Sequence, residues 1–416
     1  MKGSSGSGAG ATAGTASDSD AASRPDRTTA PASGSGSASE ADPGTVAVVG
    51  GGAVGLHAAV DLADAGVDVT VYERGTPGDT ETAGSSARAA GVCYDAYAGD
   101  VDARVGARAL ERFREADALE TCPYVMLARE GDERTAAALD ANVDRMRAHG
   151  RPVRRLDADD LAAAFPGVRT DDVAVAAVTE NAGWTDPAAY VRDLAGEARA
   201  AGVDVRTGEA VGVAVDPPGV VVDGVVERYD AVVVAAGAHT KRLLADAGVA
   251  VPLKPYRVQA LVAGVGGAYD APMVFDATSE VYCRPHPEGL LAGDGTVPRE
   301  ADADAYERAG DPAFEAETVA DVRHRLPDVD PSLDRSWAGL CVATPDGDPL
   351  LGAVRPGVVV AAGWQGHGFM RSPATGELVA EVVRGGDPPA PFDPARVDGD
   401  EEFEVVEGMS VDPEGE

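Results

Sequence analysis

The sequence predicts an α/β protein with two interleaved domains, one built on a parallel sheet and the other on an antiparallel sheet. Three buried strands that each run into a glycine-rich turn lie near the start, middle and end of the chain, at 45–55, 229–237 and 358–368. Strand–turn–helix units of this kind are typical of parallel sheets, because parallel neighbours need crossover connections. Residues 252–297 instead alternate short strands with glycine turns, which is typical of an antiparallel sheet.

The first turn carries the pattern G-x-G-x-x-G between a strand over 45–49 and a predicted helix over 53–65. Glycines at this spacing let the backbone approach a pyrophosphate, whose negative charge is stabilised by the helix N-terminus. The pattern therefore predicts a bound dinucleotide. We assign to its binding the turn residues Gly50, Gly52, Ala53, Val54 and Gly55.

An acid follows where a ribose would need one. A second strand, over 67–72, ends at Glu73, about 20 residues beyond the turn, where a carboxylate accepts hydrogen bonds from ribose hydroxyls. Arg74 comes next, and an acid in this place favours a free ribose over the ribose phosphate of NADP. The chain has one full G-x-G-x-x-G pattern, at the beginning of its ordered part, and a late glycine loop at 363–368 offers a second contact for a long ligand. These features favour FAD over NAD.

Further cofactor contacts are predicted in the other glycine-containing segments. The small-residue loop 84–91 can approach a cofactor closely, the strand over 229–235 ends in a turn, and 211–215 is a short strand. The loop at 363–368 precedes a helix predicted from about Ser372, with Ser372 as N-cap and Pro373 at the first helical position. The residues assigned from these segments are Ser85, Ser86, Arg88, Val211, Ala236, Gly237, Gly363, Gly366, His367, Gly368 and Phe369.

The remaining patterns complete the predicted domains. Residues 100–165 have helical periodicity, and a helix beginning at Pro187 is expected to be capped by Asp186 and to end at Gly202. The Ser-, Gly- and Ala-rich residues 1–44 lack the apolar groups that would offset chain entropy, so we expect a disordered tail. The predicted division is an FAD domain over 45–99, 180–245 and 335–397, a substrate domain over 100–179 and 246–334, and an acidic C-terminal tail over 398–416.

Charge restricts the partners and the solvent. The net charge is −35, and three of the 35 basic residues are lysines. So negative a surface makes nucleic acid an unsuitable partner, and it repels itself unless salt screens it. We interpret the acidity as adaptation to a salty cytoplasm, which predicts a higher unfolding midpoint in molar salt than in dilute buffer.

No targeting or metal signal competes with this interpretation. The start of the chain lacks the apolar segment of a secretory signal, and no apolar run reaches the roughly 20 residues of a membrane helix. The four cysteines are widely spaced, without a C-x-x-C pair, which predicts buried free thiols and no metal site. We therefore expect a cytoplasmic protein.

Several segments together resemble a known family. They are Gly50–Gly55 with Glu73 and Arg74, Gly84–Ser86, Gly183–Pro187, Ala235–Ala238 and Gly363–Phe369. In this order they resemble the D-amino-acid oxidase superfamily of FAD-dependent oxidoreductases, over about residues 45–397. Trp337–Leu340, Thr344–Gly352 and Gly366–Ala374 are most similar to the branch containing glycine oxidase and the beta subunits of sarcosine oxidase and proline dehydrogenase.

The resemblance implies a Rossmann-like FAD domain and oxidation of the C–N bond of an amino acid or N-alkyl amino acid. Hydride would pass to a non-covalently bound FAD, the imine would hydrolyse in water, and oxygen or an electron carrier would accept the electrons. Two alternatives stay open. One is a regulatory flavin-binding subunit of a larger complex, and the other is a dehydrogenase of hydroxy acids or glycerol phosphate. The sequence also leaves open whether the chain forms a homo-oligomer.

A substrate carboxylate needs a cation, and the planar fork of arginine suits it. The candidates are Arg284, Arg371 and Arg88. Arg284 shares a predicted strand face with Tyr282, since alternate residues of a strand point the same way, so this pair is assigned to the substrate site. Arg371 follows Met370, which stands where several members of the resembling family carry a substrate-binding lysine.

Two further residues are weighed for chemistry. His367 lies between two glycines and is included as a candidate catalytic group, with hydrogen bonding to the flavin favoured over proton transfer. Cys341 stands where glycine oxidase-like members of the family carry a substrate arginine, and a structural thiol is favoured over covalent flavin attachment. The catalytic candidates are therefore Tyr282, Arg284, Arg371 and His367.

Overall fold

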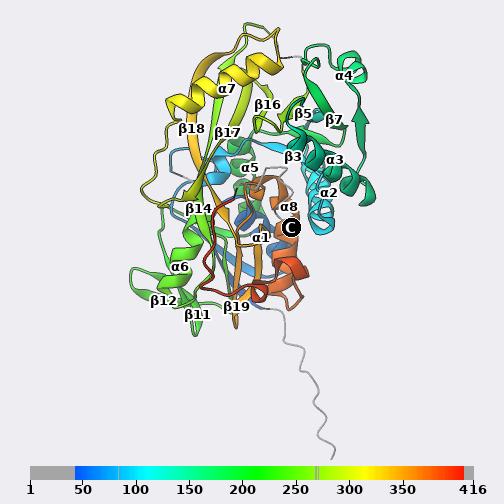
Figure 1. Cartoon of the computed structure of the whole chain (residues 1–416). Coiled ribbons are helices and arrows are strands. Elements are labelled where there is room, and N and C mark those ends of the chain that lie inside the picture. Colours follow the sequence, from blue (N-terminus) through cyan, green and yellow to red (C-terminus); the bar gives the residue numbers. More distant parts are fainter. Residues whose placement is uncertain (1–42, 83, 268, 270, 407–416) are drawn as a thin grey trace, which may run out of the picture. The chain divides into compact units, whose positions relative to one another are not determined.

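A six-stranded sheet, mostly parallel, carries the three strand–turn units of the sequence (Figure 1). The computed structural model describes residues 43–406, except 83, 268 and 270. The strand order is β19-β20-β13-β1-β2-β9, with antiparallel pairing at β19/β20 and parallel pairing elsewhere. The strands are β1 (Thr45–Val49), β2 (Asp68–Glu73), β9 (Asp204–Thr207), β13 (Ala231–Val234), β19 (Leu350–Arg355) and β20 (Val358–Ala362).

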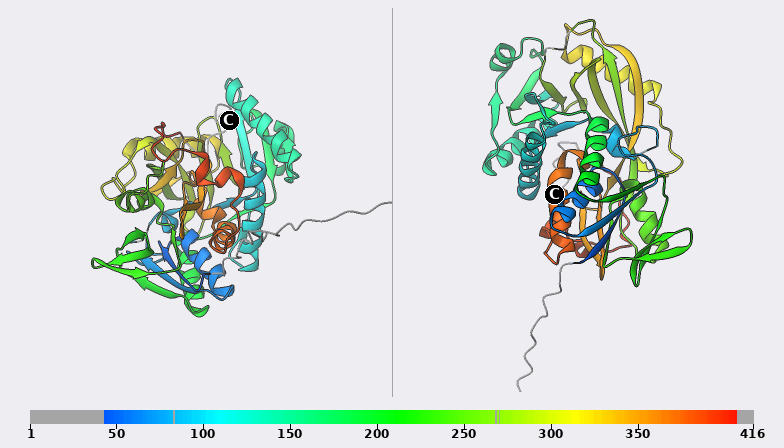
Figure 2. Two further views of the ribbon diagram at one scale, coloured as in Figure 1. Left: turned by 90° about the horizontal axis from the view of Figure 1, so that it is seen from below. Right: turned by 180° about the vertical axis from the view of Figure 1, so that it is seen from behind.

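Four helices cover one side of this sheet. They are α1 (Ala53–Asp64), α2 (Asp100–Glu115), α5 (Pro187–Ala200) and α8 (Gly368–Val383). Helix α1 packs against α8 and α5, and Figure 2 shows the blue α1 beside the orange α8. A small residue permits this close approach, because a Cβ atom at Gly376 would lie 2.4 Å from the Cβ of His57. The buried side chains of these helices form one core with the strands.

A second, eight-stranded sheet has the order β18-β14-β17-β16-β15-β5-β7-β6. Its pairs are antiparallel except β15/β5, which is parallel. Helices α4 and α7 pack into the core on one face, and α3 packs into the core on the other. The elements are α3 (Glu133–Ala148), α4 (Ala158–Ala164), α7 (Pro312–Arg325), β5 (Tyr124–Arg129), β6 (Val153–Leu156), β7 (Val173–Thr179), β14 (Lys254–Gly264), β15 (Met273–Asp276), β16 (Val281–His286), β17 (Gly289–Glu300) and β18 (Ser332–Ala343).

Smaller elements accompany these two sheets. Two three-stranded sheets have the orders β10-β11-β12 and β3-β8-β4. Their strands are β3 (Val92–Tyr94), β4 (Glu120–Thr121), β8 (Ala182–Trp184), β10 (Gly212–Val215), β11 (Pro218–Val222) and β12 (Val225–Arg228). Helix α6 (Thr240–Asp246) and four short 3-10 helices, at Ser85–Arg88, Gly237–His239, Ala390–Phe392 and Pro394–Arg396, complete the described chain.

The predicted fold class is confirmed, and so are several local features. The first strand, turn, helix and second strand lie where the sequence predicts them, and Asp186 caps α5 by accepting the N–H groups of Ala188 and Ala189. Cys93, Cys122 and Cys283 are buried thiols, as predicted, and Cys341 is only partly buried.

The purely helical interpretation of residues 100–165 is wrong, because β4, β5 and β6 lie between its helices. Strand β5 is central in the eight-stranded sheet, and Tyr124 to Ala128 are all buried. A strand covered on both faces lacks the polar–apolar alternation that identifies half-buried strands. Its apolar run could therefore be mistaken for part of a helix.

The predicted start of the last helix is also wrong. Helix α8 begins at Gly368, so Ser372 is not its cap and Pro373 lies inside the helix. A proline there lacks the N–H that would bond the carbonyl of Phe369. The Ser372 hydroxyl donates to that carbonyl instead, at 2.7 Å, so the helix continues past the proline.

Three expectations about organisation have different outcomes. The described residues lie in one compact unit, and the division into two domains stays a prediction. The predicted tails fall largely outside the described residues, although Val405 is buried and Lys254 lies over the ring of Phe403. Among the described residues, no helix has the length and apolar character that crossing a membrane requires.

Candidate active site

A cavity of about 510 Å³ extends from the first glycine turn to the eight-stranded sheet. One part is lined by the turn at Gly50, by Glu73 and by the loop after β13. Another part is lined by aromatic side chains from the eight-stranded sheet and its neighbours. Residues from the beginning, middle and end of the chain therefore share one long cavity.

The glycines of the first turn are required by backbone contacts as well as by a ligand. Gly50 has φ 115°, and a Cβ there would lie 2.4 Å from the carbonyl oxygen of Ala235. A Cβ at Gly55 would lie 2.0 Å from the carbonyl oxygen of Gly50. Larger residues at either position would push the turn, α1 and β13 apart.

Glu73 organises this turn from the end of β2. Its Oε2 accepts the N–H of Gly51 at 2.7 Å, and its Oε1 accepts the N–H of Gly75 at 2.7 Å. The side chain is buried at the cavity wall. The carboxylate therefore fixes the turn in place and lies where a ribose hydroxyl could also reach it.

The two helices that begin at the cavity have no carboxylate in their first turns. Gly52 and His367, the N-cap residues of α1 and α8, make no side-chain cap, and neither first turn contains an acid. By contrast, α2 has Asp100 and Asp102 in its first turn. The Ser86 hydroxyl accepts the N–H of Ala53 at 3.1 Å. Two positive helix ends without acids, in so acidic a chain, fit an anionic ligand such as the FAD pyrophosphate.

The loop before α8 turns sharply at the wall of the cavity. Gly363, Gln365 and Gly366 all have positive φ, of 88°, 47° and 84°. Within the described part of the chain, the buried Trp364 Nε1 and Gln365 Oε1 have no hydrogen-bond partner. Buried polar atoms in this state are costly unless a ligand or water pairs with them. Both atoms are shielded from the space of the cavity, and Gln365 does not line it, so the loop faces the cavity through Gly363, Trp364 and Gly366.

Aromatic residues line the part of the cavity next to the eight-stranded sheet, which we call the aromatic chamber; it is formed by Tyr94, Tyr97, Tyr124, Phe275, Tyr282 and Trp337. The rings of Tyr94 and Tyr124 are stacked, with centroids 5.0 Å apart. Burial raises the pKa of both tyrosines, so their hydroxyls stay protonated and can donate hydrogen bonds.

His367 lies at the border of the aromatic chamber. Its Nε2 is 3.2 Å from the hydroxyl of Tyr94, and its ring packs edge-on against Tyr94 and Tyr97. Burial, together with the nearby charge of Arg371, lowers the pKa of His367 to about 3. The imidazole is therefore neutral near pH 7, as a hydrogen-bonding role requires.

The two predicted substrate arginines point elsewhere. Arg284 is 2% exposed; its Nε donates to the carbonyl of Ala90 at 2.5 Å, and its guanidinium lies over the ring of Trp184. Arg371 pairs with Asp102 at 2.5 Å. Neither arginine is among the described residues that line the cavity, whereas Tyr282 is.

Nearly all the predicted cofactor residues do line the cavity. The exception is Gly55, which packs against the carbonyl of Gly50. The lining residues are Gly50, Gly52, Ala53, Val54, Glu73, Arg74, Ser85, Ser86, Arg88, Val211, Ala236, Gly237, Gly363, Gly366, His367, Gly368 and Phe369.

The sequence interpretation missed two groups of lining residues. Tyr94 and Tyr124 are in strands outside the glycine blocks, and Tyr306 and Arg308 are in a loop between β17 and α7. No local pattern marks them. The tyrosines in these strands are the signal that could identify them, because aromatic side chains often line ligand pockets.

The fold and the cavity define a flavin-binding oxidoreductase. This chain belongs to the family described as FAD dependent oxidoreductase (DAO), whose family model matches residues 45–382. The predicted superfamily, the FAD cofactor and the oxidoreductase class are thereby confirmed.

Curated relatives and solved structures agree with this membership. The chain is 28% identical over 365 residues to a glycine oxidase of Geobacillus kaustophilus, covering 81% of this chain and 92% of the relative. It is 33% identical over 237 residues to a D-amino-acid oxidase of Bradyrhizobium diazoefficiens, covering 53% and 54%. The crystal structure of the Geobacillus glycine oxidase matches with a TM-score of 0.74 at 26% identity, covering 86% of this chain and 100% of that one. An L-proline dehydrogenase from P. horikoshii shares the fold, with a TM-score of 0.75 at 24% identity, covering 86% and 98%.

Proposed function

We propose that this protein oxidises the C–N bond of an amino acid or an N-alkyl amino acid. The observation that carries the proposal is the aromatic chamber, which continues the FAD cavity and presents tyrosine hydroxyls beside a neutral imidazole. The relatives named glycine oxidase and D-amino-acid oxidase support the same class of substrate.

The chain's own residues have three tasks in this proposal. When bound, FAD supplies the hydride acceptor. The rings of Tyr94, Tyr124 and Trp337 exclude water and favour the neutral amine, whose lone pair must be free before the C–H bond is cleaved. The hydroxyl of Tyr282 and the imidazole of His367 orient polar groups of the substrate, and tight positioning of this kind lowers the barrier.

Arg88 is the proposed partner of the substrate carboxylate. Of the three arginines that the sequence offers, it is the one that lines the cavity. Its Nη1 donates to the Tyr306 hydroxyl at 3.2 Å, and the carbonyl of Arg88 accepts the indole N–H of Trp337 at 3.0 Å. Its backbone is thus fixed beside the aromatic chamber, while its side chain is only half-buried.

The test is anaerobic mixing of the FAD-loaded protein with a panel of compounds. The panel contains glycine, sarcosine, proline, D- and L-amino acids, hydroxy acids and glycerol phosphate. Loss of the oxidised flavin absorbance with an amino or N-methyl amino acid supports the proposal. Reduction by a hydroxy acid alone would select the dehydrogenase alternative, and no reduction by any compound would select the regulatory subunit.

The role of Arg88 has a separate test. Arg88→Gln should raise KM for the reactive amino acid by roughly tenfold or more, because a charged hydrogen bond to the carboxylate is lost. The matching amine without a carboxylate should be oxidised equally by both proteins. An equal loss with both compounds would contradict the assignment.

A further inference from the structure

The segment 301–311, between β17 and α7, crosses the wall of the FAD cavity, and we call it the strap. Ala303, Tyr306 and Arg308 of the strap line the cavity. It starts from the eight-stranded sheet, yet its contacts reach the turns and loops at the end of the six-stranded sheet. The strap therefore joins the two sheets across the ligand site.

The base of the strap is firmly held by the eight-stranded sheet. Arg257 of β14, which is 9% exposed, donates to the carbonyl of Glu307 at 2.9 Å and to the carboxylate of Asp311 at 2.7 Å. Gln259 accepts the N–H of Asp311 at 2.7 Å. Ala338 of β18 donates to the carbonyl of Arg308 at 2.8 Å. This end is fastened by several bonds from the buried Arg257 and by backbone hydrogen bonds, although the Asp311 carboxylate itself is 49% exposed in its pair, so several contacts must break together before it opens.

The tip of the strap is held differently, by one carboxylate. Asp304 pairs with Arg74 at 3.0 Å, with His239 at 2.9 Å and with Arg242. All three partners line the cavity at the ends of β2 and β13, near Glu73. Arg74 and Asp304 are about two-fifths exposed, so water and salt reach this contact.

The middle of the strap covers the cavity between these two ends. Arg88 donates to the hydroxyl of Tyr306 at 3.2 Å, and Arg308 donates to the carbonyl of Glu81 at 2.8 Å. These contacts seal the strap to the loop that follows β2. Tyr306 and Arg308 line the same cavity as the Gly50 turn and the aromatic chamber, so a ligand that fills this cavity lies against the middle of the strap.

We propose that the strap retains bound FAD and that Asp304 is the latch that keeps it closed. While Asp304 holds its three partners, the cofactor is covered, and it leaves when the tip opens about the fixed base. Exposed ion pairs suit a latch because each contributes little and opens readily, while two ion pairs, from Arg74 and Arg242, and a hydrogen bond from His239 act together on one carboxylate. The latch is independent of the substrate, so it does not rest on the proposed function.

The test measures FAD release from the loaded protein. FAD fluorescence increases on dissociation, and its rate is followed after dilution for the wild type, Asp304→Asn and Asp302→Asn. Asp302→Asn is the control, because it removes one negative charge from the same strap. The asparagine side chain can still accept the N–H of residue 304, as Asp302 does at 2.9 Å. In low salt, Asp304→Asn should release FAD roughly tenfold faster than the control.

Salt gives a second readout. The ratio of the FAD release rates of Asp304→Asn and Asp302→Asn should approach one near 1 M salt. The screening length is then about 3 Å, so the intact latch of Asp302→Asn is also weakened. Taking the ratio cancels the general repulsion between FAD and this acidic chain. Equal release rates in low salt, or a ratio that salt leaves unchanged, would overturn the latch.

A third variant tests the latch even if Asp304→Asn fails to fold. Arg242 is 57% exposed, and Arg242→Gln removes one partner of the same carboxylate from outside the strap. It should also speed FAD release, by a smaller factor than Asp304→Asn. If the Asp304→Asn apoprotein is unfolded, Arg242→Gln decides the question. The latch is refuted if Arg242→Gln then releases FAD as slowly as the wild type.

Discussion

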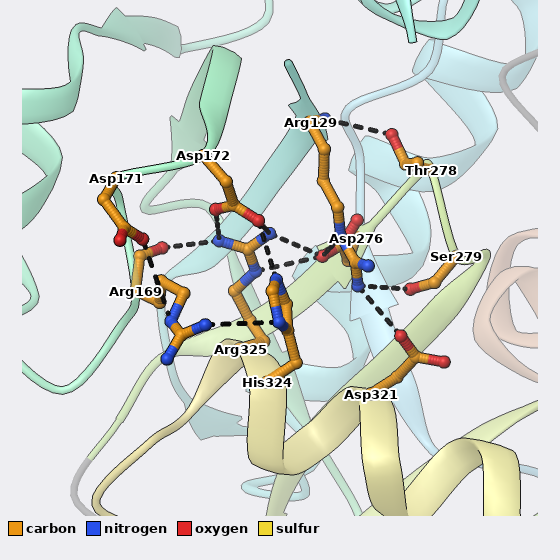
Figure 3. Close-up of polar contacts among 10 residues, drawn as sticks. All are labelled: Arg129, Arg169, Asp171, Asp172, Asp276, Thr278, Ser279, Asp321, His324 and Arg325. Carbon is orange, nitrogen blue, oxygen red and sulfur yellow. Dashed lines mark hydrogen bonds and ion pairs between the residues drawn. The ribbon is translucent and has the colours of Figure 1, made fainter. Parts of the chain in front are cut away.

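Two regions of this protein use charge in opposite ways. At α7, four acids pair with four bases and two hydroxyl residues join them; we call this group the α7 network (Figure 3). It consists of Asp171, Asp172, Asp276, Asp321, Arg129, Arg169, His324, Arg325, Thr278 and Ser279. Around the FAD cavity, the first turns of α1 and α8 have no acid at all. The difference shows that the net charge of −35 is not spread evenly, because acids are paired with bases in the α7 network but are absent from these two helix N-termini at the cavity.

The α7 network is centred on two buried groups. Asp276 and Arg325 are each 2% exposed, and Asp276 Oδ2 accepts from Arg325 Nε at 2.9 Å and from Arg129 Nε at 2.8 Å. Arg325 also reaches Asp172, which accepts from His324 at 2.7 Å. Figure 3 shows these side chains converging from α7, from the end of β5 and from the loop before β7. The network attaches α7 to the sheet, and none of its ten residues is among those that line the FAD cavity.

The largest expected effect is on this network. Asp276→Asn leaves Arg129 and Arg325 without their shared charge, and breaking a buried pair costs about 3–5 kcal/mol. Urea unfolding should show this loss in the free energy of unfolding. Asp330→Asn is the control, because Asp330 is 91% exposed in its pair with Arg323 and should change stability by less than about 1 kcal/mol. Similar losses in both variants would contradict the difference between buried and exposed pairs.

A smaller effect is expected where Glu73 fixes the first turn. Glu73→Ala removes the acceptor of the Gly51 and Gly75 N–H groups, and bonds to a charged group contribute about 1.5–3 kcal/mol. The apoprotein should bind FAD roughly tenfold to hundredfold more weakly, as measured by fluorescence titration. Asp68→Ala, at the exposed opposite end of β2, should bind FAD as the wild type does. If Glu73→Ala binds FAD as tightly as the wild type, Glu73 does not contribute to FAD binding.

The aromatic chamber can be disturbed without touching the FAD turn. A Cβ at Gly293 of β17 would lie 2.1 Å from the hydroxyl of Tyr282, so Gly293→Ala must displace this ring. We expect kcat/KM for the reactive substrate to fall roughly tenfold while the FAD affinity stays the same. Gly264→Ala, where the nearest atom is 3.9 Å away, is the matched control. Equal activities of the two variants would show that Tyr282 has no positioning role.

The smallest expected effect concerns pH. Burial, with the nearby charge of Arg112, lowers the pKa of His57 to about 3, whereas an unfolded histidine titrates near 6.5. Below about pH 6.5 the unfolded state therefore binds a proton that the folded state does not. The free energy of unfolding is unaffected by His57 above that pH and decreases as the pH falls from 6.5 towards 3.

The measurement is the slope of the unfolding free energy against pH. When the pH is lowered from about 6 to 5, the free energy of unfolding should fall by about 1 kcal/mol less in His57→Gln than in the wild type. Only the difference between the two slopes is informative, because the carboxylates titrate in both proteins. Parallel slopes would mean that the buried imidazole takes up a proton in the folded state.

The outcome of each site prediction depends on how local its signal is. The strand, turn, helix and second strand of the first block lie where the sequence predicts them, because their contacts join residues close in the sequence, and the role of Glu73 at the cofactor stays a prediction. The directions of Arg284 and Arg371 were not foreseeable: their partners, Ala90 and Asp102, are far along the chain. Alternation along β16 does put Arg284 on the face of Tyr282, but a backbone carbonyl takes its guanidinium before it reaches the cavity.

The sequence by itself determined the cofactor fold of this protein, since glycine turns, strand lengths and helix caps act over a few residues. Only the tertiary structure decided which side chains face the cavity, where the strap fastens and which arginine remains beside the aromatic chamber. The physical reason is that a buried charge goes to whichever partner satisfies it best. In this chain those partners come from distant segments, which the folded structure brings together.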